Sequence, residues 1–131
     1  MSEFREEEYT ILVVDDEEDL AEIVGEELSD LGFNVRIAFG GHEAMEIVER
    51  EKIDYVISDI KMPGGDGKEL LSRIRAKDSK LPIVLLMTGF SEYSEFELKD
   101  SGAIELLNKP IHIDVLYERL KQHFAALKLA S

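Results

Sequence analysis

The strongest constraint on the fold is a set of four short apolar runs, each of which ends in polar or charged side chains. In chain order these runs cover residues 11–14, 55–58, 83–87 and 104–108. Short runs rich in β-branched residues, with turn signals behind them, predict buried parallel strands. Open α/β sheets place their chemistry just past the carboxyl ends of such strands. We therefore expect the functional residues along one edge of a parallel sheet.

Helical patterns alternate with the predicted strands. We expect strands at about 9–14, 33–38, 54–58, 83–87 and 104–108, and helices at about 17–30, after 41, after 67, at 91–100 and from 113. This alternation implies a parallel sheet with right-handed crossovers and helices on both faces. It predicts a flavodoxin-like, doubly wound α/β fold with (βα)5 topology, three α/β/α layers and strand order 2-1-3-4-5. Strands 1 and 3 are neighbours in that order, so Asp15, Asp16 and Asp59 should converge.

The first helix pattern carries an apolar stripe that predicts its buried face. The stripe consists of residues at helical spacing, namely Leu20, Ile23, Val24, Leu28 and Leu31. Acidic residues in its first turn suit the positive end of the helix dipole. Gly32 is expected to end this helix.

Composition and charge limit the classes of function. The 131 residues suit one domain, with residues 1–8 as an acidic lead-in, residues 9–129 as the domain and no output domain. A formal net charge of −14 disfavours direct nucleic-acid binding, because the phosphate backbone favours a basic face. No apolar run is long enough to span a bilayer, and the lead-in lacks the apolar region of a secretory signal. Since the chain has no cysteine, we expect no disulfides and a cytoplasmic protein without membrane insertion.

Three carboxylates at one sheet edge form a candidate metal site. Carboxylates held close together repel one another unless a cation neutralises them. Asp16 and Asp59, helped by Asp15, offer the all-oxygen ligands that Mg²⁺ prefers. An alternative is that Asp15 and Asp16 only cap the first helix. The presence of Asp59 at the neighbouring strand end favours the metal site.

A lysine, a hydroxyl and an unshielded amide join the acids at this edge. Lys109 follows a mostly apolar strand, Thr88 offers a hydroxyl, and Gly89 leaves its backbone N–H uncovered by a side chain. Together with a metal, these groups suit an incoming phosphoryl group. A carboxylate accepts phosphoryl as an acyl phosphate, and Asp59, alone at its strand end, is the best-placed nucleophile.

With these residues the chain resembles the receiver domains of two-component response regulators, which are CheY-like signalling domains, from Tyr9 onward. Each motif alone is weak, and their combination in this order is specific. The matching stretches are residues 13–17 and 59–64, Asp66-Gly67, Thr88-Gly89, Gly102-Ala103 and Lys109-Pro110.

The resemblance implies that Asp59 is the phosphoacceptor of a phosphorelay. It would receive phosphoryl from the phosphohistidine of a sensor histidine kinase or a histidine phosphotransfer protein. Thr88 and Lys109 would bind the phosphoryl oxygens, and the peptide bond between Lys109 and Pro110 would be cis. The chain would then be a stand-alone signalling domain and not an enzyme, and phosphorylation would change its binding to an unknown downstream protein.

The resemblance also implies how Mg²⁺ is bound. Asp16 and Asp59 would ligate the ion directly, together with the main-chain carbonyl of Lys61. Asp15 would act through a water molecule. The chemistry of the domain itself would be limited to Mg²⁺-dependent transfer onto Asp59 and slow hydrolysis from it.

Two departures from the family pattern fall where these domains usually present their output face. Many receivers have Tyr or Phe three residues before the lysine, and this chain has Leu106 there. The stretch between the threonine and the lysine is also one residue shorter than usual. Our hypothesis is that the signal moves the segment with Phe90, Tyr93 and Phe96 in place of the usual threonine–aromatic relay.

The aromatic and histidine side chains outside the site have simpler interpretations. The helical spacing of Phe90, Tyr93 and Phe96 predicts core packing, with a partner-binding patch as the alternative. The three histidines, His42, His112 and His123, lack the spacing of a metal site. We expect solvated or capping roles for them.

Other classes of protein match the sequence less well. A haloacid-dehalogenase-like hydrolase would need an acid two residues after the nucleophile, where this chain has Lys61. A flavodoxin would need a Ser/Thr-rich loop after the first strand, and a P-loop would need its glycine-rich lysine signature. The remaining alternative is an atypical receiver that binds proteins without phosphorylation, which Leu106 and the shortened segment favour.

Overall fold

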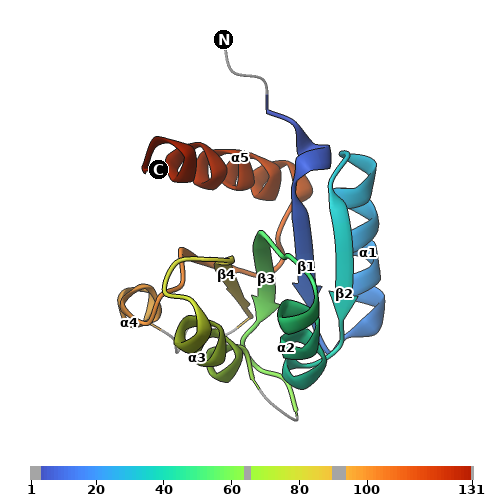
Figure 1. The fold of residues 1–131 in the computed structure, drawn as a ribbon. Coiled ribbons are helices and arrows are strands. Elements are labelled where there is room, and N and C mark those ends of the chain that lie inside the picture. Colours follow the sequence, from blue (N-terminus) through green and yellow to red (C-terminus); the bar gives the residue numbers. More distant parts are fainter. Residues whose placement is uncertain (1–3, 64–65, 90–93, 131) are drawn as a thin grey trace.

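The computed structural model describes residues 4–63, 66–89 and 94–130, and its strands form a parallel sheet. The strand order is β2-β1-β3-β4-β5, as predicted. Figure 1 shows β2, β1, β3 and β4 in this order. The strands are β1 (Thr10–Val14), β2 (Asn34–Ala38), β3 (Tyr55–Asp59), β4 (Ile83–Thr88) and β5 (Glu105–Asn108). Each neighbouring pair is parallel. The predicted flavodoxin-like, doubly wound fold is confirmed.

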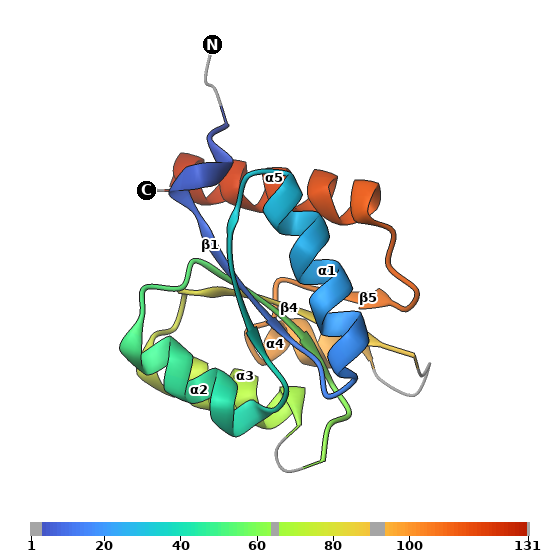
Figure 2. The same ribbon diagram turned by 90° about the vertical axis from the view of Figure 1, so that its right-hand side faces the viewer.

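Helices cover both faces of the sheet. They are α1 (Glu18–Asp30), α2 (Gly41–Arg50), α3 (Gly67–Lys77), α4 (Glu95–Asp100) and α5 (Ile113–Ala130), preceded by the short 3-10 helix η1 (Glu6–Glu8). Figures 1 and 2 show α1 and α5 on one face, with α2, α3 and α4 on the other. Among the described residues, no helix combines the length and the hydrophobicity that crossing a membrane requires.

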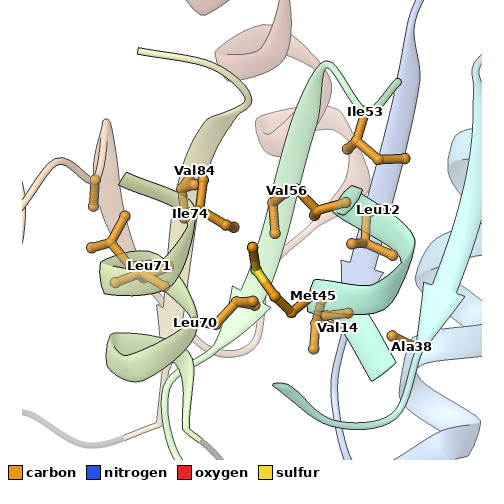
Figure 3. Close-up of a cluster of buried hydrophobic side chains, with 14 of the residues drawn as sticks. Leu12, Val14, Ala38, Met45, Ile53, Val56, Leu70, Leu71, Ile74 and Val84 are labelled. Carbon is orange, nitrogen blue, oxygen red and sulfur yellow. The ribbon is translucent and has the colours of Figure 1, made fainter. Parts of the chain in front are cut away.

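Two hydrophobic cores lie on the two sides of the sheet, and alternate strand residues feed them. Leu12 and Val14 of β1 face α2 and α3, in the cluster that Figure 3 shows. Ile11 and Val13 face α1 and α5. All four side chains are buried, because helices cover both faces of the sheet. This double burial explains why the sequence shows continuous apolar runs and not an apolar–polar alternation.

The buried face of α1 differs from the predicted stripe. Leu20 is 39% exposed and Ile23 is 52% exposed, so their prediction as core residues is wrong. The buried positions on α1 are Ala21, Gly25 and Leu28. A Cβ on Gly25 would lie 2.8 Å from Cδ1 of Ile37, which shows how closely the helix approaches β2. The small residues Ala21 and Gly25 let this face of α1 contact the sheet closely, and Leu20 and Ile23 lie outside that face.

The helix boundaries otherwise follow local chemistry. Gly32 has a φ of 111° and ends α1, as predicted, because this backbone conformation favours glycine. The fourth helix was predicted from residue 91, but its described part begins at Glu95. The reason is a cap, since the Ser94 hydroxyl accepts the N–H of Glu97 at 3.3 Å.

The described part of the acidic lead-in, residues 4–8, is packed against the domain. The ring of Phe4 stacks on Tyr9, with centroids 5.3 Å apart, and also meets Phe124 of α5 at 5.9 Å. The Tyr117 hydroxyl donates a hydrogen bond to Glu6, which raises the pKa of Tyr117 to about 12. Residues before β1 thus share the aromatic cluster that supports α5.

Candidate functional site

The predicted site residues meet at the carboxyl edge of the sheet. In the register of β1 and β3, Val14 lies opposite Ser58, so Asp15 and Asp59 follow at neighbouring positions. Thr88 is the last residue of β4, the next strand along. Asp15, Asp59 and Thr88 are 3%, 8% and 1% exposed, which is unusual for polar side chains that lack a structural or chemical role.

Lys109 joins the two buried acids. Its Nζ donates to Oδ2 of Asp15 and to Oδ2 of Asp59, each at 3.0 Å. The Lys109 backbone N–H donates to the carbonyl of Thr88 at 2.8 Å, which fixes the start of the loop after β5. Glu17 lies 3.9 Å from the same ammonium group and was not predicted from the sequence. The lysine is therefore part of the site and not a surface ion pair.

For both Asp59 and Lys109, burial and the ion pair between them shift the pKa in opposite directions. Burial raises the pKa of Asp59, and the repulsion from Asp15 adds to this, while Lys109 works against both. For Lys109 burial lowers the pKa, but the hydrogen bonds to Asp59 and Asp15 outweigh it and raise the pKa overall. The ammonium group therefore stays charged at neutral pH and neutralises one of the two carboxylates.

The three acids lie close enough to share a cation. Oxygen atoms of Asp15, Asp16 and Asp59 lie within 4.8 Å of one another, and Asp16 is exposed to solvent. Over the described ranges, no other group of three metal-ligating side chains is present. All three donors are carboxylate oxygens, which suits a hard divalent cation such as Mg²⁺.

The alternative in which Asp15 and Asp16 cap the first helix is wrong, because the N-cap of α1 is Glu17 and no side chain caps it. Oδ1 of Asp15 accepts the backbone N–H of Glu17 at 3.0 Å, at the entrance to α1. The other oxygen, Oδ2, accepts from Lys109. Asp15 therefore both shapes the turn into α1 and lines the site.

The start of α3 holds the backbone behind Asp59. Asp66 caps this helix by accepting the N–H of Glu69 at 2.8 Å. The Gly67 N–H donates to the carbonyl of Ile60 at 2.7 Å, and a Cβ on Gly67 would lie only 2.3 Å from the Asp59 carbonyl oxygen. Gly67 was part of the Asp66-Gly67 family match but had no predicted role of its own. Its signal in the sequence is a glycine directly after a capping aspartate.

The remaining predicted residues contribute no buried polar side chain to this cluster or lie outside the described residues. Lys61 is exposed in the loop after β3. Leu106 of β5 is partly buried against the core on the α2, α3 and α4 face. Phe96 is 80% exposed, so its predicted core packing is wrong. Phe90 and Tyr93 lie outside the described residues, and the role of this segment as a switch stays a prediction.

The cis peptide bond and the exposed histidines were also predicted from the sequence. The bond between Lys109 and Pro110 is cis, as the resemblance implied, and the bond between Leu81 and Pro82 is also cis. His42 and His112 are exposed, as expected. His123 is not: its side chain is 12% exposed and is hydrogen-bonded on both ring nitrogens, so the expected solvated or capping role is wrong.

The fold and the site define the class of protein, and sequence comparison agrees. Residues 11–121 match the family model described as the response regulator receiver domain. The chain therefore belongs to the response regulator receiver domain family.

Individual relatives and solved structures support this membership. The transcriptional regulatory protein ZraR of Salmonella typhimurium is 37% identical over 116 residues, which are 88% of this chain and 26% of ZraR. The chain spans between a quarter and a half of the length of the curated relatives it matches.

Two structural neighbours match over nearly their whole length. A receiver domain from Clostridium thermocellum has a TM-score of 0.86 and 28% identity, covering 94% of this chain and 99% of that one. TrrA from Thermotoga maritima, solved in complex with Mg²⁺ and BeF, has a TM-score of 0.77 and 36% identity, covering 87% and 97%.

Proposed function

We propose that this chain is a phosphoacceptor domain that receives a phosphoryl group from a phosphohistidine onto Asp59. The observation that carries the proposal is the pairing of two buried carboxylates, Asp15 and Asp59, through one lysine at the edge of the sheet. A buried acid pair is costly, and a structural role alone would be met as well by apolar side chains. The site therefore has the character of a reaction centre.

In the proposed reaction the phosphoryl group passes from the donor to Asp59 without any further reactant. A carboxylate oxygen of Asp59 attacks phosphorus, the P–N bond to the donor imidazole breaks, and that imidazole nitrogen takes up a proton. The product is an acyl phosphate on Asp59. Lys109 lies 3.0 Å from the acceptor carboxylate, so its charge is in place for the phosphoryl oxygens. The buried Thr88 hydroxyl and the Gly89 amide are the other groups that we assign to these oxygens.

Mg²⁺ fits the same residues. Asp16 and Asp59 are the proposed direct ligands, with the main-chain carbonyl of Lys61, and Asp15 is proposed to act through water. Bound there, the ion would neutralise negative charge on the phosphoryl group. The Mg²⁺–BeF complex of TrrA, at 36% identity, supports this assignment.

The first test measures phosphorylation directly. We expect one added phosphoryl group by mass spectrometry after incubation with a small phosphodonor and Mg²⁺, and none in Asp59→Asn. Asp16→Asn keeps the nucleophile, so it should still be modified but need more Mg²⁺. Asp114→Asn, an exposed acid at the start of α5, should behave like the wild type.

The same experiment separates the proposal from its alternative. A chain that gains no phosphoryl group, under conditions that modify another receiver domain, would be a protein-binding module that works without phosphorylation. Leu106, which replaces the usual aromatic residue and packs on the core, is the observation that favours this alternative.

An apolar groove beside the site gives the phosphohistidine partner a place to dock. The groove has a volume of about 400 Å³, and the exposed Leu20 and Ile23 of α1 line it together with Pro110. Asp15 and Lys109 also line it, so it is continuous with the phosphoacceptor site. We assign it to the apolar face of the helix that carries the donor histidine.

Ile23→Glu tests this docking surface. The side chain is 52% exposed, so the fold should persist, while transfer from a phosphorylated histidine phosphotransfer protein should slow by about tenfold or more. Modification by a small phosphodonor should be unchanged, because the site itself is intact. Phe96→Glu, at an exposed apolar position on the opposite face, is the matched control. Equal slowing in both variants would contradict the assignment.

A further inference from the structure

A largely buried network of hydrogen bonds links β3, β5 and α5 at the end of β3 opposite to Asp59. The hydroxyl of Tyr55, at the start of β3, lies 2.6 Å from Nδ1 of His123 on α5. Nε2 of His123 lies 3.0 Å from Oε1 of Glu105, the first residue of β5. The rings of Tyr55 and His123 are stacked, with centroids 5.8 Å apart and an interplanar angle of 13°. Three segments distant in sequence therefore meet at one imidazole.

The protonation state follows from the partners. An ionised carboxylate only accepts, so Nε2 of His123 carries the hydrogen that faces Glu105. In the neutral ring Nδ1 is then an acceptor, and the Tyr55 hydroxyl donates to it. In this state both ring nitrogens of His123 have a hydrogen-bond partner. No buried side-chain nitrogen or oxygen within the described ranges lacks a partner.

Protonation of His123 disrupts the hydrogen bond between Nδ1 and the Tyr55 hydroxyl. The imidazolium carries a hydrogen on Nδ1 as well, which faces the hydrogen of the Tyr55 hydroxyl. That hydroxyl is fully buried and would have to turn its hydrogen away from its present acceptor. A buried donor without an acceptor destabilises the closed arrangement. Neutral His123 is therefore the form that holds the three elements together.

The charged groups around the ring come from all the elements that pack near it. Glu105 of β5 favours the imidazolium, whereas Arg119 of α5 and Lys99 of α4 oppose it. Arg119 lies 3.4 Å from the other oxygen of Glu105, so it competes for the same carboxylate. Tyr55 contributes its uncharged hydroxyl from β3. Burial is the largest influence, and with these charges it lowers the pKa of His123 below 6.5.

We propose that Tyr55, His123 and Glu105 form a proton-controlled latch that holds α5 on β3 and β5 when His123 is neutral and loosens it on acidification. The latch does not depend on phosphorylation. The latch is connected to the phosphoacceptor site through the backbone of β5. This strand is followed directly by Lys109, which binds Asp15 and Asp59. Acid conditions are therefore expected to loosen the side of the domain that carries this lysine.

The direction of the pH effect follows from linkage. Burial in the closed latch lowers the pKa of His123 from its ordinary value of 6.5, and opening is expected to reverse this shift. Below about pH 6.5 the open form binds more protons, so the closing equilibrium falls by up to about tenfold per pH unit until the lower pKa is passed. The contribution of the latch is complete above this range and is lost as pH falls.

The test follows the ring of His123 in the whole chain by NMR. This ring should titrate below pH 6.5, since burial lowers its pKa. Protection of α5 amides against hydrogen exchange should fall by about tenfold between about pH 7.5 and about pH 5.5 in the wild type, after correction for intrinsic exchange. In His123→Gln this pH dependence should disappear, whereas His112→Gln should keep it.

A second variant keeps the proposal testable if His123→Gln does not fold. Glu105→Gln retains an oxygen that accepts from Nε2 but removes the charge that favours the imidazolium. It should lower the pKa of His123 further and shift the loss of α5 protection to lower pH. The proposal is overturned if His123 titrates at or above pH 6.5, or if Glu105→Gln raises its pKa or leaves it unchanged.

Discussion

Lys109→Met is expected to lower the free energy of unfolding by about 3 kcal/mol near neutral pH, since breaking a buried ion pair leaves an uncompensated charge. Methionine keeps most of the apolar stem and removes the ammonium group that lies 3.0 Å from both Asp15 and Asp59. The two carboxylates, 3% and 8% exposed, then face each other without a cation. Urea denaturation of both proteins measures the difference.

The pH dependence of this loss identifies its cause. Without Lys109 the pKa of Asp59, already raised by burial, rises further, because the lysine was the main influence that lowered it. An acid with a raised pKa in the folded state gains stability as pH falls through that pKa. The deficit of Lys109→Met should therefore shrink on acidification.

The double variant Lys109→Met, Asp59→Asn is the matched control. Asparagine removes one of the two charges, so most of the lost stability should return, as a double-mutant cycle would show. Mg²⁺ should also stabilise Lys109→Met more than it stabilises the wild type, if the ion binds the folded acids as proposed. A deficit that is the same at all pH values and persists in the double variant would mean that the lysine acts through packing alone.

The proximity of these residues could be predicted from the sequence because it depends on few rules. Apolar runs of four or five residues identified the strands, and the alternation with helices set their order. The doubly wound order places β1 beside β3, which brings Asp15 and Asp59 together without any knowledge of side-chain contacts. The bridge that Lys109 makes between them could not be predicted, because it depends on how far a flexible side chain reaches.

Other features escaped sequence analysis because they depend on close packing between distant segments. The stripe on α1 contains Leu20 and Ile23, but the helix approaches β2 through Gly25, and that approach decides which side is buried. His123 is a polar residue outside the apolar pattern of α5, so the sequence does not predict that it is buried. Its partner Tyr55 is 68 residues away in the sequence, and only the packing of α5 on β3 brings the two together.

Gly67→Ala is expected to lower the free energy of unfolding by about 3 kcal/mol, an overpacking effect at the upper end of the usual range. The new Cβ would lie 2.3 Å from the carbonyl oxygen of Asp59 and 3.0 Å from Cα of Ile60. Both neighbours are backbone atoms, so no side chain can rotate away to relieve the contact. Either the start of α3 or the backbone of Asp59 must move. A fall of about 10 °C in Tm would correspond to this loss.

Gly89→Ala is the control for this substitution, because it also adds one methyl group to a loop at the same edge of the sheet. A Cβ at Gly89 meets no atom within 4 Å, and its stability should stay within about 0.5 kcal/mol of the wild type. If Gly67→Ala were as stable as Gly89→Ala, the close approach of α3 to the Asp59 carbonyl would not be a constraint on the site. If it is unstable and its affinity for Mg²⁺ falls as well, α3 positions the proposed phosphoacceptor through its backbone, which a glycine alone permits.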